Sequence, residues 1–171
     1  MKNRTPQFEF SRPLQVDRVP KLGSTEKLSA EPEELKALAK RFKIPALHAL
    51  SAEIRATPWR GGGMKLEGHI TADMEQVSVI SLEAFRETVS VPLARYFLPH
   101  GAVVDNEQED DADPIDNGWI DLGAVVAETL ALDLDPYPRK PGEAFPGHVE
   151  DDGAADKPPS PFAILAAKKN S

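Results

Sequence analysis

The 171-residue sequence contains no cysteine. This absence excludes disulfide-stabilised scaffolds and thiolate metal sites. The sequence also has no run of about 18 apolar residues, so we expect no transmembrane helix. Residues 1–4 are not followed by the apolar stretch of a secretory signal. These absences fit a cytoplasmic protein.

Catalytic and metal-binding motifs are missing as well. No Gly-x-Ser-x-Gly nucleophile motif occurs, and Gly61-Gly62-Gly63 lacks the Gly-Lys-Ser/Thr ending of a phosphate-binding loop. The acidic run 105–113 has Asp110 where a calcium loop requires glycine, so a solvated loop is the better interpretation. No two of the four histidines have helical metal-ligand spacing: His48, His69, His100 and His148. We expect no enzyme, no metal and no cofactor, and keep a dispersed active site as the least favoured alternative.

Charge is unevenly distributed along the chain. Residues 1–100 hold 15 Lys/Arg and 12 Asp/Glu, whereas residues 101–171 hold 5 and 16. The acidic part would be repelled by phosphate, so the whole chain is not expected to coat nucleic acid. A local basic surface on the first part remains compatible with this balance.

The clearest structural signal is a pair of alternating segments on either side of a glycine-rich turn. Alternation with period two predicts two β-strands with one dry and one wet face, and the turn at 58–63 predicts a hairpin. The dry positions are Leu50, Ala52, Ile54, Ala56, Met64, Leu66, Ile70, Ala72 and Met74.

The remaining segments complete an α+β fold. Helices are predicted from Pro32, a favourable first helical residue, and after Asp121, a favourable N-cap. Further strands are expected near residues 8–16, 24–28, 77–82 and 88–97. We therefore expect a curved antiparallel β-sheet, with a barrel-like form as the alternative, packed against two helices within a domain of residues 1–135.

An acidic arm is predicted to follow this domain. Residues 136–159 contain six Pro and three Gly among 24 positions, a composition typical of a flexible linker. Residues 160–171 are expected to form a short amphipathic helix capped by Ser160. Because so short a helix is marginal in water, its apolar residues Pro161, Phe162 and Leu165 need a docking surface. That surface could belong to a partner or to the chain's own sheet.

An aromatic and basic group near the hairpin suggests RNA contact. Trp59 next to Arg60 and Lys65 could stack on bases and neutralise phosphates. Alternatively, Trp59 only seals the end of the hairpin, and this simpler interpretation is favoured. The candidate RNA-contacting residues are Arg55, Trp59, Arg60, Lys65 and Arg95, with Arg12 as a further basic candidate.

Two segments resemble the YceD family of large ribosomal RNA subunit accumulation proteins. They are residues 120–138, with Glu128-Thr129-Leu130-Ala131-Leu132 and Pro136-Tyr137-Pro138, and the terminal Pro161-Phe162-Ala163-Ile164-Leu165. The chain is most similar to alphaproteobacterial members. Many members carry Cys-x-x-Cys-Leu where this chain has Ser78, Ser81 and Leu82, so any role of those cysteines is absent here.

The resemblance implies a function in accumulating large-subunit rRNA and in ribosome biogenesis, with no catalysis. We expect an adaptor that binds a large-subunit ribosomal protein, an assembly factor or rRNA, with no membrane and no small-molecule substrate. Direct RNA binding by a basic face of the sheet is the alternative.

Overall fold

The computed structural model describes residues 8–102 and 111–144. The elements described belong to one compact unit, which ends at Pro141. In chain order they are β1 (Pro13–Gln15), the 3-10 helix η1 (Val16–Arg18), β2 (Ser24–Ser29), α1 (Pro32–Phe42), β3 (Ala46–Trp59), the 3-10 helix η2 (Arg60–Gly62), β4 (Gly63–Val77), β5 (Ala84–Pro99), β6 (Asp113–Ile115), β7 (Trp119–Asp121) and α3 (Leu122–Asp133).

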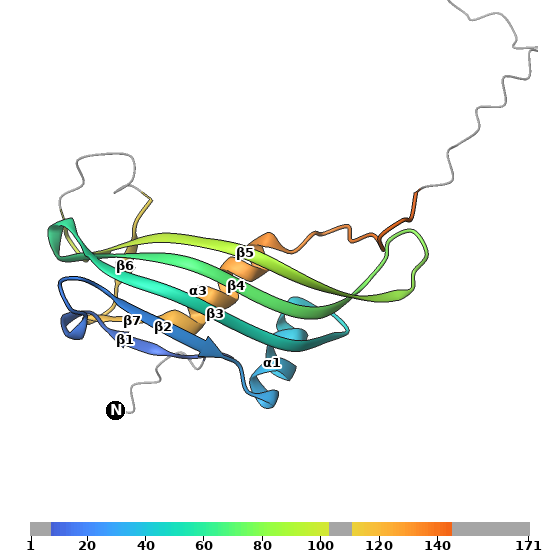
Figure 1. Cartoon of the computed structure of the whole chain (residues 1–171), viewed down its shortest axis with the longest axis horizontal. Coiled ribbons are helices and arrows are strands. Elements are labelled where there is room, and N and C mark those ends of the chain that lie inside the picture. The colour runs from blue at the N-terminus through green and yellow to red at the C-terminus, as the bar shows by residue number, and fades with distance from the viewer. Residues whose placement is uncertain (1–7, 103–110, 145–171) are drawn as a thin grey trace, which may run out of the picture. The chain divides into compact units, whose positions relative to one another are not determined.

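The main sheet has five strands in the order β2-β3-β4-β5-β6. All neighbours are antiparallel except β5 and the short β6, which run parallel. A separate two-stranded sheet joins β1 to β7. The α+β prediction with two helices is confirmed, and the sheet is open, with β2 and β6 at its edges (Figure 1).

The predicted hairpin is present as β3 and β4, paired from Ala46 with Glu75 to Trp59 with Gly63. All nine predicted dry positions are buried, and they pack with Leu38 of α1 and Val126 and Leu130 of α3 in one core. The opposite face of the sheet carries the alternating polar residues. Period-two patterning therefore determined both the strands and the face that is available to a partner.

Glycines allow close backbone contacts at two places in this core. A Cβ on Gly68 would lie 2.0 Å from the carbonyl oxygen of Glu53, and one on Gly123 would lie 2.5 Å from that of Phe10. Both distances are far below van der Waals contact. Gly68 thus lets β4 approach β3 closely, and Gly123 lets α3 approach the N-terminal segment.

Both helices start as the sequence predicts. At the start of α1, Glu31 and Glu34 form a reciprocal capping box ahead of Pro32. At the start of α3, the Asp121 carboxylate accepts the N–H of Ala124 at 3.2 Å and that of Arg12 at 2.8 Å. Asp121 therefore caps α3 and also fixes the N-terminal segment.

The strand predicted at 77–82 is wrong beyond Val77. Residues 78–83 form the turn between β4 and β5. The buried hydroxyl oxygen of Ser78 accepts the N–H groups of Ile80 (3.1 Å) and Ser81 (3.4 Å). These local bonds satisfy the backbone without a strand partner, so the β-branched composition of the segment was misleading.

The predicted domain boundaries remain predictions, because most of 136–159 and all of 160–171 lie outside the described residues. The first residues of the predicted linker follow the domain surface. The N–H of Val79 donates to the carbonyl oxygen of Pro138 at 2.9 Å, and Lys140 lies 3.6 Å from Glu83.

Candidate functional site

Three of the predicted RNA-contacting residues lie on the polar face of the sheet, near the β3–β4 turn. Arg55 alternates with buried Ile54 and Ala56, so its side chain is on the side away from the core. The same alternation places Lys65 on that face, and Trp59 continues it to the end of β3. Arg60 follows directly in η2.

Two aromatic rings meet at this end of the sheet. The ring centroids of Trp59 and Tyr96 are 4.7 Å apart, with the planes tilted by 46°. The Arg60 guanidinium carbon lies 5.3 Å from the Trp59 ring centre, and the Lys65 ammonium nitrogen lies 5.7 Å from that of Tyr96. We call Trp59, Arg60, Lys65 and Tyr96 the aromatic–basic cluster. Both pairings are within cation–π range.

Tyr96 was missed in the sequence. It joins the cluster because the β4–β5 register places it directly opposite Lys65. Side chains alternate between the two faces of a strand. Because Phe97 points into the core, its neighbour Tyr96 points to the opposite, polar face. The register that brings it next to Trp59 depends on the length of the 78–83 turn, which the sequence did not give.

The electrostatics of the cluster are locally basic. The carboxylate of Glu67 lies 2.6 Å from the Lys65 ammonium, and this hydrogen bond raises the pKa of Lys65. Arg55 donates to the carbonyl oxygen of Leu22 at 2.9 Å. Two cations, Arg60 and Lys65, therefore lie beside two aromatic rings, with the Glu67 carboxylate next to Lys65. This combination can stack on a base and contact phosphate.

Arg95 lies on the opposite face of the sheet. It lies two positions from each of the buried residues Leu93 and Phe97, and therefore on the same face of β5. Its guanidinium forms an ion pair with Asp113. A second carboxylate, that of Glu128 in α3, lies 3.6 Å away. The structure thus places Arg95 in a link between β5, β6 and α3, apart from the aromatic–basic cluster.

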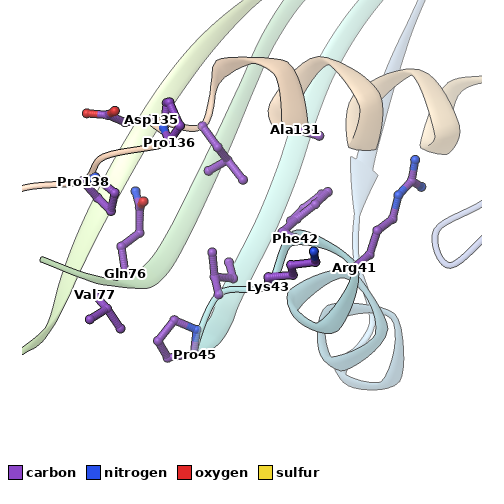
Figure 2. A pocket seen from close by; sticks show the side chains of 12 residues that line it. Arg41, Phe42, Lys43, Pro45, Gln76, Val77, Ala131, Asp135, Pro136 and Pro138 are labelled. Carbon is purple, nitrogen blue, oxygen red and sulfur yellow. The ribbon is translucent and has the colours of Figure 1, made fainter. Parts of the chain in front are cut away.

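A groove occurs at the other end of the β3–β4 hairpin (Figure 2). Its volume is about 430 Å³, within the usual range of ligand sites. The walls come from the C-terminal end of α1, the end of β4 and the segment after α3. Lining side chains include Phe42, Ile44, Val77, Leu134 and Pro136. We call this the α1–β4 groove.

The predicted C-terminal contact residues Pro161, Phe162 and Leu165 lie outside the described residues. In the described ranges, no three His, Asp or Glu side chains are grouped so as to hold a metal ion. No helix of residues 8–102 or 111–144 is long and apolar enough to cross a membrane.

Comparison with protein-family models matches the chain to a family. The model described as "Large ribosomal RNA subunit accumulation protein YceD" matches residues 66–167, which is 102 of 171 residues. The chain belongs to the YceD family. Membership implies a role in the accumulation of large ribosomal subunit RNA. No curated protein and no solved structure matches the chain.

The YceD match covers the candidate sites unevenly. It includes Tyr96, the β4 and α3 sides of the α1–β4 groove, and the C-terminal segment with Phe162. Trp59, Arg60 and α1 precede it. Within the match, the β4–β5 turn is held by the Ser78 hydroxyl, which accepts two backbone N–H groups.

Proposed function

We propose that this protein supports large-subunit rRNA accumulation as a non-enzymatic, cytoplasmic adaptor, and that the aromatic–basic cluster is its RNA-contacting surface. The observation that carries this proposal is the contact of Trp59 with Tyr96, with Arg60 and Lys65 beside the two rings. Stacking of a base on an aromatic side chain contributes about 1–3 kcal/mol and suits single-stranded RNA.

The electrostatics favour a local contact over a broad one. Along the polar face, cations alternate with carboxylates: Lys27 lies 3.4 Å from Glu53, and Arg86 lies 2.5 Å from Asp73. Such paired charges attract phosphate weakly. At the β3–β4 turn, Arg60 and Lys65 lie beside two half-buried aromatic rings, so an unpaired RNA loop or end is the expected ligand.

The test is fluorescence anisotropy of a labelled single-stranded large-subunit rRNA fragment with the full chain at low salt. Trp59→Ala should weaken binding by about tenfold, from the loss of one stacking contact. Arg60→Ala should also weaken it. Arg86→Ala is the matched control, because it removes an arginine from the same face of the sheet, away from the two rings. Unchanged binding by both cluster variants, with their fold intact, would reject the RNA surface.

A second candidate contact is the C-terminal segment, because the YceD match extends through it to residue 167. Pro161, Phe162 and Leu165 would bind a large-subunit ribosomal protein or an assembly factor, and the acidic arm would favour a basic partner. The test compares the full chain, a chain that ends at Lys157, and Phe162→Ala in pull-downs of purified ribosomal proteins. Equal capture by all three would reject this contact, with Lys169→Ala as the control.

A further inference from the structure

Several exposed apolar side chains of the described residues come from segments that neighbour the α1–β4 groove. Seven large hydrophobic residues are exposed in the described ranges. Five of them come from the end of β4, the 78–83 turn and residues 132–137, and Val77 is the one that lines the groove itself. The five are 38% to 85% exposed: Val77, Val79, Leu82, Leu132 and Tyr137. Exposed apolar side chains beside a groove are typical of a protein-binding surface.

The groove itself continues this apolar surface inward. Phe42, Ile44 and Pro45 form one side, and Leu134, Pro136 and Pro138 form the other, with Val77 between them. Figure 2 shows Phe42 and Lys43 on the α1 side and Asp135, Pro136 and Pro138 on the far side. A groove with this lining can receive the apolar side chains of a peptide.

The two walls carry opposite charges. Lys43 lies at the C-terminal end of α1 and has no ion-pair partner among the described residues, whereas Arg41 pairs with Glu9 at 3.1 Å. The facing wall contributes Asp135. The lining therefore combines apolar side chains with charges of both signs, which matches a peptide that carries both signs better than a uniformly anionic nucleic acid.

We propose that the α1–β4 groove binds a short amphipathic segment of a partner protein. Its apolar side chains fill the groove, an acidic flank lies against Lys43 and a basic flank lies against Asp135. This contact is separate from the RNA-contacting cluster, which is at the other end of the hairpin. The chain would then hold RNA at one end of the sheet and protein at the other.

The probe is a fluorescein-labelled amphipathic peptide of about 14 residues, long enough to form a helix on the surface. One face carries Leu and Phe, one flank Glu and the other Lys. Val77→Asp should weaken its binding to the full chain by at least about tenfold, because Val77 lines the groove and the substitution places a charge in its apolar lining. Leu22→Asp is the control, since Leu22 is 86% exposed outside the groove.

Charge reversal tests the orientation of the walls. The Lys43→Glu variant places a carboxylate on each wall. A peptide with two basic flanks should therefore bind this variant about fivefold better than the probe with one acidic and one basic flank does. Wild type should prefer the probe with one acidic and one basic flank. Equal binding of the probe to wild type and Val77→Asp would overturn the proposal, as would undetectable binding to wild type. The proposal would also be overturned if Val77→Asp no longer bound the labelled rRNA fragment, because the groove would then be an RNA-binding surface. Thermal unfolding of each variant verifies the fold.

Discussion

The guanidinium of Arg12 donates two parallel hydrogen bonds to the carboxylate of Glu34, at 2.8 Å and 2.9 Å. The same guanidinium donates to the carbonyl oxygen of Ser29 at 2.9 Å and lies 4.6 Å from the centre of the Phe10 ring. Glu34 also accepts the N–H of Glu31. This pair therefore joins the N-terminal segment, the end of β2 and the start of α1, and Arg12 has a structural role rather than an RNA-contacting one.

Removing this pair should destabilise the domain. Arg12→Ala loses several charge-assisted hydrogen bonds in a half-buried setting, so the free energy of unfolding should fall by about 2 kcal/mol. Urea unfolding followed by circular dichroism measures the change. The control is Lys36→Ala, whose ion pair with Glu33 is exposed and should be worth less than about 0.5 kcal/mol. Equal effects of the two substitutions would contradict the assigned role.

Acid should weaken the same contact. The hydrogen bond from Arg12 lowers the pKa of Glu34 below its ordinary value of 4.5. A carboxylate with a lowered pKa stabilises the fold above its unfolded-state pKa, and this contribution disappears as the pH falls through the folded-state pKa. Urea midpoints measured from pH 7 to pH 3 should therefore fall less steeply in Glu34→Gln than in wild type. Parallel curves would show that Glu34 does not contribute to the acid sensitivity.

Gly68→Ala should be among the most damaging single substitutions in the sheet. The added Cβ would lie 2.0 Å from the Glu53 carbonyl oxygen, so β3 and β4 must separate. We expect a loss of about 3 kcal/mol or more, or failure to fold. At Gly101 an added Cβ meets nothing within 4 Å and the only penalty is a φ of 78°, so Gly101→Ala should cost about 1 kcal/mol. Similar thermal unfolding midpoints for the two variants would contradict the close approach.

RNA affinity should depend on salt in proportion to the cations at the β3–β4 turn. Each phosphate neutralised on single-stranded RNA changes the slope of log K against log salt by about −0.7. Because Lys65 is paired with Glu67, contacts from Arg55 and Arg60 predict a slope near −1.4, and Arg60→Ala should bring it to about −0.7. Anisotropy titrations at several salt concentrations give the slope. A slope unaffected by Arg60→Ala would exclude this arginine from phosphate contact.

Local patterns predicted much of this fold. Alternation identified β3, β4 and their buried faces, because one face of the hairpin packs on a single core. Pro32 and Asp121 marked helix starts because their chemistry acts within one turn. The turn at Ser78 was missed because a buried hydroxyl can replace strand pairing without any change in hydrophobic pattern.

Long-range placement was harder to predict. Arg95 was grouped with the other cations by charge, although its parity with Leu93 and Phe97 already indicated the core-facing side. The contact between Trp59 and Tyr96 needed the register of three strands. The α1–β4 groove is lined by residues that are more than 90 positions apart, such as Phe42 and Leu134. No local sequence pattern predicts that such distant residues lie together.

The pairing of β1 with β7 affects how the chain matures during translation. Arg12 and Asp121 are 109 positions apart, and the backbone of Phe10, which is almost fully buried, lies against Gly123 of α3. The nascent chain therefore lacks these contacts of its N-terminal segment until β7 and α3 have left the ribosomal exit tunnel. A chain interrupted before Asp121 would lack the partner of its own first strand, so the native domain is completed only late in synthesis.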